Sequence, residues 1–230
     1  MQLFFSHNIN KNMIELSKSE SNHCVKVLRK SLNDLVQVID GCGNLYRGRL
    51  VDLNPNKALI EITEVKKNFG VREKYVHIAI APTKKVDRFE WFVEKVVEIG
   101  IDEISLIKCQ NSERFKINQE RIRKIILSAT KQSLKGFLPK LNQIEDFKHF
   151  VKKDYGNSRK SIAYLKNEIT STLLDQCKGS SNLVCIGPEG DFTDLEIDCA
   201  ISNGFYPITL GKSRLRTETA GLVACTLMNI

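Results

Sequence analysis

Residues 183 to 196 read Leu-Val-Cys-Ile-Gly-Pro-Glu-Gly-Asp-Phe-Thr-Asp-Leu-Glu. The apolar residues at the start are typical of a buried strand, and the turn that follows contains two glycines and a proline. Thr193 and Glu196 have the spacing of a capping box, in which two side chains satisfy backbone donors at the start of a helix. Phe192 and Ile197 flank this start as a hydrophobic staple. The stretch therefore predicts a strand, a glycine turn and a helix in direct succession.

From residue 75 onward, strands alternate with helices, which is typical of an α/β fold with a mostly parallel sheet between two helical layers. Residues 75–81 form a nearly continuous apolar run, which favours a strand covered on both faces. Helical stripes follow from Val86 to Gly100 and from Ile122 to Ser133. Thr217 is the predicted N-cap of a last helix. Further strands are predicted over residues 104–107, 161–165, 183–186 and 205–210.

The first 70 residues have a different pattern, in which short strands are separated by turns. Strands are predicted over residues 36–39, 45–51 and 58–65, and this regular spacing favours a small barrel. A helix is predicted from Ser19 to Arg29. Residues 66–70 are polar and turn-prone, so the sequence predicts one domain over residues 1–70 and a second over residues 71–230.

The composition allows two interpretations, a chain with a polyanionic partner and a basic protein without a specialised partner. The 230 residues include 35 lysines and arginines against 27 aspartates and glutamates, a net charge of +8, and a basic surface attracts RNA or acidic membranes. Seven cysteines without a C-x-x-C pair favour reduced thiols, and four scattered histidines lack metal-ligand spacing. The start lacks a secretory signal, and no run approaches the roughly 20 apolar residues of a membrane span. We expect a cytoplasmic chain without a metal or a membrane segment.

A second loop, over residues 210–220, also leaves the end of a predicted strand and leads into a helix. Ligands of open parallel sheets bind outside the carboxyl ends of the strands, so the two loops together predict a small-molecule pocket. Helix N-termini attract anions, and Arg214 and Arg216 add positive charge there. Neither loop has the pattern of a Rossmann dinucleotide site or of a P-loop, and two ordinary turns are the alternative interpretation.

These residues resemble the RsmE family, the small-subunit ribosomal RNA uracil-N3 methyltransferases of the SPOUT superfamily. The resemblance covers nearly the whole chain. It is carried by Gly187-Pro188-Glu189-Gly190, Leu215-Arg216-Thr217-Glu218-Thr219-Ala220, Lys95 to Gly100, His23 to Arg29 and Asp40-Gly41. It implies an N-terminal PUA-like β-barrel that binds RNA and a C-terminal SPOUT α/β domain with a deep trefoil knot. It also implies S-adenosyl-L-methionine as the methyl donor and a homodimer.

The reaction that this resemblance implies is methylation of N3 of a specific uridine in 16S rRNA. We expect this RNA to be modified within the assembled small ribosomal subunit, and naked RNA is the alternative substrate. We expect Arg216 to stabilise charge on the uracil oxygens, and Glu218 to act as the general base or to orient Arg216. Donor-binding residues are expected at Ile186, Gly187, Glu189, Gly190, Leu210, Gly211, Leu215 and Thr217, where Glu189 either contacts the donor or ties its loop together. RNA contacts are expected at His23, Lys26, Arg29, Arg47 and Arg214.

The sequence departs from the family pattern at three positions. Lys131 and Lys135 stand where the family usually has Glu and Arg, and lysine does not reproduce the bidentate contacts of arginine. Asp191 stands where a glycine is usual, directly before the region where a helix favours an acid. Two other functions are open at this point. One is a SPOUT methyltransferase that modifies a ribose 2′-oxygen or another base, and the other is an RNA-binding assembly factor without catalysis.

Overall fold

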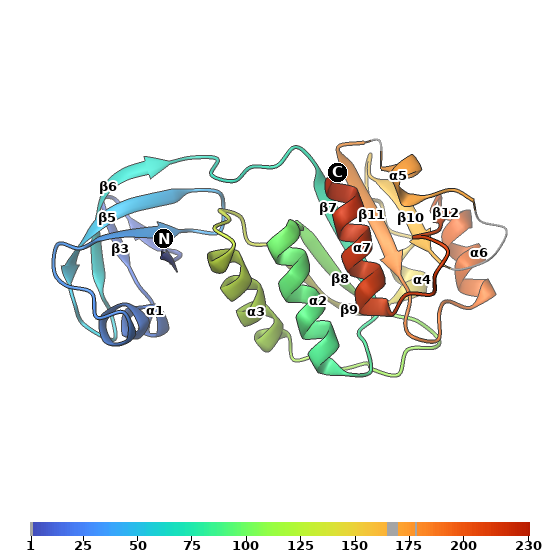
Figure 1. Cartoon of the computed structure of the whole chain (residues 1–230), viewed down its shortest axis with the longest axis horizontal. Helices are drawn as coiled ribbons and strands as arrows, with labels where there is room; N and C mark the ends of the chain where they lie inside the picture. The colour runs from blue at the N-terminus through green and yellow to red at the C-terminus, as the bar shows by residue number, and fades with distance from the viewer. Residues whose placement is uncertain (1, 165–169, 178) are drawn as a thin grey trace. The chain divides into compact units, whose positions relative to one another are not determined.

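The computed structural model describes residues 2–164, 170–177 and 179–230, which divide into two units (Figure 1). The N-terminal unit consists of Met1–Val71 together with Thr130–Leu138, and the C-terminal unit consists of Arg72–Ala129 together with Pro139–Ile230. The sequence pattern did not assign residues 130–138 to the N-terminal unit. Their backbone joins it through a hydrogen bond from the N–H of Gly43 to the carbonyl oxygen of Gly136, at 3.0 Å.

The N-terminal unit is built on a six-stranded curled sheet with the order β1-β4-β5-β6-β3-β2, in which only the β1–β4 pair is parallel. Its strands are β1 (Leu3–Phe5), β2 (Asn8–Asn10), β3 (Met13–Glu15), β4 (Leu35–Ile39), β5 (Leu45–Asp52) and β6 (Leu59–Lys66). Side chains of Phe4, Ile14, Leu50 and Ile60 are fully buried at its centre. The three longer strands confirm the predicted ones, whereas β1 to β3 were missed because three residues are too short for a visible alternation.

The helix predicted from Ser19 to Arg29 is two helical segments. The α-helix α1 (Lys18–Asn22) continues as the π-helical turn η1 (His23–Val27), in which the N–H of Leu28 bonds to the carbonyl oxygen of His23 at 2.9 Å. Arg29 then has a φ of +52°, which lies in the left-handed region and ends the helix. In this widened turn the side chain of Cys24 faces the core, where it is fully buried. Such turns are rare and cannot be read from apolar periodicity.

The C-terminal unit has a six-stranded sheet in which every pair is parallel, as the α/β prediction required. Its order is β12-β10-β11-β7-β8-β9. The strands are β7 (Tyr75–Ile80), β8 (Glu103–Lys108), β9 (Lys140–Asp146), β10 (Arg159–Ala163), β11 (Ser181–Ile186) and β12 (Tyr206–Ile208). The predicted strand over residues 161–165 corresponds to β10, and its last residue, Leu165, lies outside the described residues.

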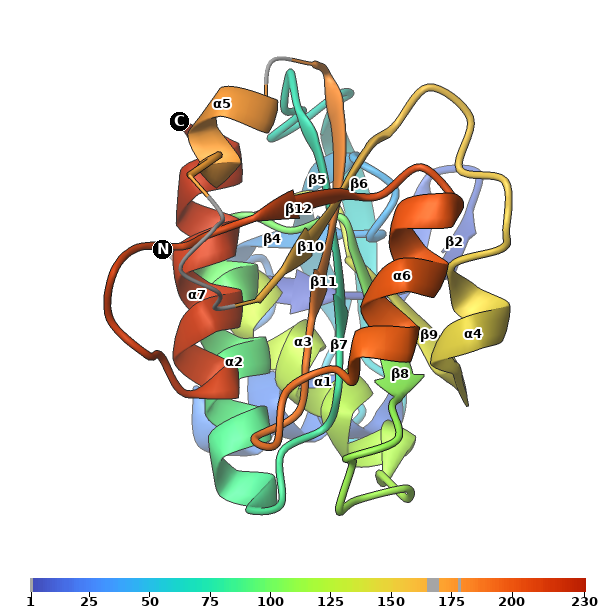
Figure 2. The same cartoon turned by 90° about the vertical axis from the view of Figure 1, so that its right-hand side faces the viewer.

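Helices cover both faces of this sheet (Figure 2). On one face lie α2 (Val86–Ile99), α5 (Leu173–Gln176) and α7 (Thr217–Asn229), and on the other lie α4 (Phe147–Phe150) and α6 (Asp194–Ser202). The capping box of Thr193 and Glu196 is present at the start of α6. The remaining helix of the described residues is α3 (Gln119–Gln132). None of the described helices is long and apolar enough to cross a lipid bilayer.

Candidate functional site

A cavity of about 400 Å³ opens at the carboxyl ends of β10, β11 and β12. Its walls come from Ala163 and Tyr164 at the end of β10, residues 186–189 and Asp191 at and after the end of β11, and parts of residues 209–217 after β12, together with Arg88 of α2 and Ala220 of α7. The cavity therefore lies where ligands of open parallel sheets bind, and its volume is within the usual range for a small-molecule site. The described residues that were predicted to bind a donor and do line it are Ile186, Gly187, Glu189, Leu210, Gly211, Leu215 and Thr217.

Gly190 lies behind the cavity wall instead of lining it. A Cβ atom added to Gly190 would be 3.0 Å from Cβ of Asn111, so the loop packs tightly on the segment after β8. The Nδ2 of Asn111 donates hydrogen bonds to the carbonyl oxygens of Gly190 (3.0 Å) and Asp191 (3.1 Å). Gly190 thus supports the shape of the cavity without contributing to its lining.

Glu189 ties its loop to the segment between β7 and α2. Its Oε1 accepts a hydrogen bond from the backbone N–H of Lys84 at 2.9 Å, and the carbonyl oxygen of Lys84 accepts two from Arg114. Arg214 donates to the carbonyl oxygen of Glu189 at 3.4 Å. These contacts hold four chain segments together at the cavity rim.

Asp191 occupies a left-handed backbone conformation with a φ of +60°. Glycine adopts this region without steric cost, whereas aspartate is one of the few other residues that enter it with some frequency. The Asp191 carboxylate accepts a hydrogen bond from the N–H of Phe192 at 2.8 Å, which supports the turn locally. The aspartate therefore fits the turn that a glycine would form at this position.

The second loop ends one residue earlier than the sequence predicts. The N-cap of α7 is Arg216, with extended φ and ψ of −72° and 154°, and Thr217 is the first helical residue, which corrects the prediction of Thr217 as N-cap. Thr217 is buried in the cavity wall, so burial prevails over its capping preference. No side chain of the described residues caps this helix, and Arg216, which is exposed, lines the cavity.

Glu218 is paired with an arginine that the sequence pattern did not single out. Nε of Arg88, in the first turn of α2, lies 3.7 Å from Oε1 of Glu218. Arg88 lines the cavity, whereas Glu218 is buried beneath its lining. Oε2 of Glu218 has no hydrogen-bond partner in the described part of the chain. The sequence offered one indication for Arg88, namely that it follows the carboxyl end of a predicted strand. Many other residues also follow a strand end, so this indication does not single out Arg88.

The predicted RNA contacts fall in separate places. In the N-terminal unit, Lys26 and Arg29 are exposed, and His23 is half-buried with its Nε2 3.1 Å from Nε2 of Gln2. Arg47 is exposed and pairs with Glu64 at 2.9 Å. It lines a groove of about 620 Å³ that Lys30 and Arg49 also line, and His23, Lys26 and Arg29 are outside that lining. Arg214 belongs to the C-terminal unit and lines the cavity described above.

Lys131 has a clear structural role within the N-terminal unit. Its Nζ pairs with Oε1 of Glu20 at 2.5 Å, and Oε2 of Glu20 accepts a hydrogen bond from the N–H of Phe5 at 3.1 Å. Glu20 is buried, so the lysine neutralises a charge that water reaches poorly. For Lys135, the backbone N–H bonds to the carbonyl oxygen of Thr130 at 3.0 Å.

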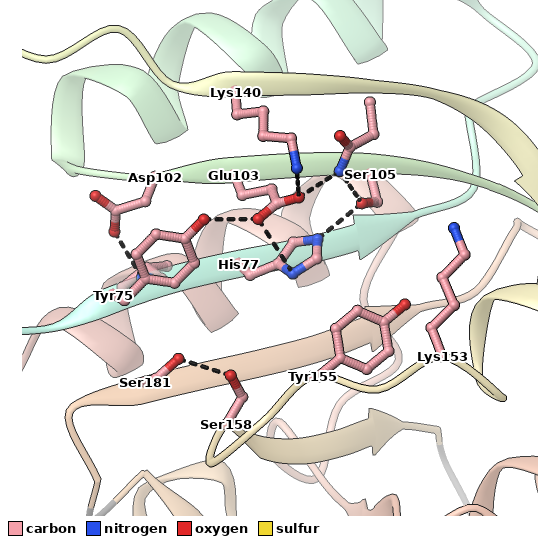
Figure 3. A network of polar contacts seen from close by, with 12 residues as sticks. Tyr75, His77, Asp102, Glu103, Ser105, Lys140, Lys153, Tyr155, Ser158 and Ser181 are labelled. Atoms are coloured by element: carbon pink, nitrogen blue, oxygen red, sulfur yellow. Dashed lines mark hydrogen bonds and ion pairs between the residues drawn. The ribbon is translucent and has the colours of Figure 1, made fainter. Parts of the chain in front are cut away.

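A buried polar network lies at the amino ends of β7 and β8 (Figure 3). Nε2 of His77 is 2.7 Å from Oγ of Ser105, and the Glu103 carboxylate accepts hydrogen bonds from the Tyr75 hydroxyl (2.6 Å), Lys140 (2.9 Å) and Asn142. Ser105 is fully buried, and Nδ1 of His77 is 3.9 Å from Glu103, which is too long for a hydrogen bond. The group is therefore structural and not a nucleophile with its base.

The network shifts the titration of two of its members. Burial lowers the pKa of His77 to about 4, so the imidazole is neutral near pH 7. Burial alone would raise the pKa of Glu103, but the hydrogen bond from Tyr75, the charge of a protonated His77 and the hydrogen bonds from Asn142 and Lys140 outweigh it and lower the pKa to about 2. Both groups thus favour their deprotonated forms in the folded protein.

Comparisons with known proteins match both units of the chain. Residues 72–229 match the model of an RNA methyltransferase domain, and residues 16–63 match that of an RNA methyltransferase PUA domain. The ribosomal RNA small subunit methyltransferase E of Mesomycoplasma hyopneumoniae is 32% identical over 232 residues, which cover 98% of each chain. The protein of the same name from Synechocystis is 30% identical over 94% of this chain and 72% of its own length.

Two solved structures have the same fold over the whole chain. A "probable rRNA-methyltransferase" from Porphyromonas gingivalis is 34% identical, with a TM-score of 0.92, and the match covers 100% of this chain and 98% of the other. A ribosomal RNA small subunit methyltransferase E from Neisseria gonorrhoeae, bound to S-adenosyl methionine, is 26% identical with a TM-score of 0.87, over 99% and 96% of the chains. The predicted combination of a PUA-like part and a SPOUT α/β domain is confirmed.

Proposed function

Since this chain belongs to the family of ribosomal RNA small subunit methyltransferase E, we propose that it transfers a methyl group from S-adenosylmethionine to N3 of one uridine in 16S ribosomal RNA. The observation that supports this most directly is the cavity between two glycine loops at the carboxyl ends of β10 to β12. Arg216 lines that cavity from the start of α7, where positive charge meets a helix N-terminus.

The cavity fits the proposed donor. Ile186, Leu210 and Leu215 supply apolar contact for a purine, and Gly211 presents bare backbone, because a Cβ atom there would have nothing within 4 Å. Glu189 and Asp191 place negative charge in a cavity that would receive a sulfonium cation. When bound, S-adenosylmethionine supplies an electrophilic methyl group. The chain's own residues hold the reacting atoms in line and stabilise charge on the base.

Methylation at N3 requires the uracil to lose its N3 proton. The negative charge that results is shared by the two ring oxygens, and a guanidinium next to them lowers the energy of the transition state. We assign this role to Arg216, as the sequence predicted. Glu218 lies beneath the cavity lining and pairs with Arg88, so we assign it to holding a guanidinium instead of accepting the proton. The proton leaves to water at the open mouth of the cavity.

The N-terminal unit is the proposed binding surface for the RNA around the target base. His23, Lys26, Arg29 and Arg47 supply its proposed RNA contacts, and Arg214 adds one beside the cavity. We further propose that the enzyme is a cytoplasmic homodimer with a deep trefoil knot in its C-terminal unit, and that the assembled small ribosomal subunit is its substrate. A single target base in a folded RNA is expected to be turned out of its stack for the reaction.

The experiment is methyl transfer from labelled S-adenosylmethionine to small ribosomal subunits that lack native modifications, followed by nucleoside analysis. We expect label in N3-methyluridine with the wild-type chain, and a loss of about 100-fold with Arg216→Ala. Label in another nucleoside would instead indicate a SPOUT methyltransferase with a different target. Donor binding without any label would indicate an RNA-binding factor without catalysis.

A further inference from the structure

Among the described residues, three arginines line the proposed methyl-donor cavity, and two of them stand at the starts of helices, whereas Arg214 lies in the loop after β12. Arg216 is the N-cap of α7, and Arg88 lies in the first turn of α2, which follows β7. The side chain of Arg88 is 35% exposed and that of Glu218 is 8% exposed. Arg88 therefore joins a buried carboxylate to the space in which the substrate base would react.

The position of Arg88 is fixed from below by Glu218. A buried carboxylate is costly unless it is paired, and the described residues offer Oε1 of Glu218 one ion-pair partner, Arg88, at 3.7 Å. Glu218 is also in the first turn of α7, where the helix dipole stabilises its negative charge. An anion held in this way restrains the guanidinium that faces it.

The chemistry of uracil gives a reason for two cations. N3 lies between two carbonyl groups, so the negative charge that develops during methylation is divided between O2 and O4. A single guanidinium on one side of the ring stabilises one of these oxygens well and the other poorly. Two guanidinium groups from separate helices are able to reach both.

We propose that Arg88 is a second catalytic guanidinium, which contacts the uracil oxygen that Arg216 does not reach, and that Glu218 positions it. This inference rests on the proposed function. In the step concerned, the N3 electron pair forms the new N–CH3 bond, the N3 proton leaves to water, and the electrons of the S–CH3 bond stay on the donor sulfur. Arg88 and Arg216 stabilise charge and exchange no proton.

The test compares full-length variants in methylation of unmodified small ribosomal subunits. Arg88→Ala should lower kcat by about 100-fold, as expected for the loss of one donor to a developing oxyanion, and change the KM of S-adenosylmethionine less than about threefold. Arg88→Lys keeps the charge and the fold, and its kcat should lie between those of the wild type and Arg88→Ala. The matched control is Arg121→Ala, because Arg121 is likewise an arginine paired with a glutamate, Glu90 of α2, but lies outside the cavity lining.

A substrate with a more acidic N3 distinguishes a catalytic role of Arg88 from a structural one. Subunits reconstituted with RNA that contains 5-fluorouridine need less stabilisation of negative charge. We expect this substitution to raise the rate of Arg88→Ala and of Arg216→Ala by a larger factor than the rate of the wild type or of Arg121→Ala. A merely structural role of Arg88 would leave that factor unchanged.

The positioning role of Glu218 is tested with Glu218→Gln, which keeps the shape of the side chain and removes its charge. We expect a smaller loss of kcat than in Arg88→Ala, and no further loss when the two substitutions are combined, because they act as one unit. Additive losses would overturn the positioning role.

Three results would overturn the assignment of Arg88. The first is a wild-type kcat for Arg88→Ala, and the second is a wild-type response of that variant to 5-fluorouridine. The third is a loss of affinity for S-adenosylhomocysteine in calorimetry without a loss of kcat, which would assign Arg88 to the donor carboxylate. Failure of the proposed function is a separate result, since the wild-type chain itself would then produce no N3-methyluridine.

Discussion

Phe92 of α2 lies directly against the bare Cα of Gly221 in α7. A Cβ atom added to Gly221 would lie 2.4 Å from the Phe92 ring, and Phe92 is fully buried. This contact brings together the two long helices on the face of the sheet where Arg88 and Glu218 pair. The glycine is therefore required by packing and not by backbone conformation.

We predict that Gly221→Ala destabilises the protein by about 2 kcal/mol, because overpacking a buried contact outweighs the gain in helix propensity. Helix propensity alone would give the opposite sign, a gain of about 1 kcal/mol. Urea unfolding measures the difference. Thr226→Ala, at an exposed position of the same helix, is the control and should leave stability unchanged or slightly higher. If Gly221→Ala were instead more stable than the wild type, α2 and α7 would move apart at little cost in free energy.

The left-handed residue in the first loop allows a second prediction. Asp191→Ala should cost about 1 kcal/mol of stability, because alanine enters the left-handed region at a steric cost. Asp191→Gly removes that cost and should be more stable than the alanine variant, although it loses the same hydrogen bond to Phe192. Thermal melting of the two variants side by side provides the measurement, and equal melting temperatures would contradict the backbone explanation.

The third prediction concerns the hydrogen bond between Glu189 and the backbone of Lys84. Glu189→Ala should weaken binding of S-adenosylhomocysteine about tenfold, since the lost hydrogen bond to a charged group frees the loop at the cavity rim. Glu189→Gln keeps an acceptor oxygen and should lose less. Calorimetry gives both dissociation constants. A loss in Glu189→Gln as large as that in Glu189→Ala would instead favour direct contact of the carboxylate with the donor.

The ion pair between Lys131 and Glu20 leads to a fourth prediction. Lys131→Glu introduces the residue that the resemblance described above led us to expect, but here it would place two carboxylates together at a buried position. We expect a loss of about 3 kcal/mol, because a buried charge would lose its partner. Lys131→Arg keeps the charge and serves as the control. Hydrogen exchange of the α1 amides should report the loss locally, and wild-type exchange in Lys131→Glu would refute it.

Stability should fall in acid in two stages. The pKa of His77 is lowered from 6.5 to about 4 and that of Glu103 from 4.5 to about 2, so the unfolded chain binds more protons than the folded one below pH 6.5. His77 therefore contributes stability above pH 6.5 that is lost down to about pH 4, and Glu103 contributes stability above pH 4.5 that is lost down to about pH 2.

For His77 alone the full loss amounts to about 3 kcal/mol. Urea unfolding between pH 8 and pH 4 measures it. In His77→Gln, which has no titrating imidazole, the slope of stability against pH between 6.5 and 4.5 should become flatter. An unchanged slope would show that other groups cause the acid sensitivity.

The sequence predicted the elements whose patterns are long or locally specified. The apolar run of β7, the stripe of α2 and the capping box of α6 all follow from residues close together in the chain. The three-residue strands β1 to β3 lack such a pattern. The N-cap of α7 was placed one residue late, because the burial of Thr217 was invisible to a capping rule.

The candidate site could be predicted in part, for a topological reason. Two of the segments that line the cavity are glycine loops, which local sequence reveals. Arg88 enters the site from a different strand end, and its pairing with Glu218 depends on how α2 packs against α7. The assignment of residues 130–138 to the N-terminal unit likewise depends on contacts between distant segments.

In the C-terminal unit, the residues that affect acid stability and the residues that line the cavity lie at opposite ends of the parallel strands. The network of His77 and Glu103 lies at the amino ends, and the cavity opens at the carboxyl ends. Substitutions in the network should alter acid tolerance while leaving the reacting groups in place, whereas substitutions of the residues that line the cavity should alter the chemistry. A lineage that moves to a more acidic habitat thus has a route of adaptation that does not pass through the active site.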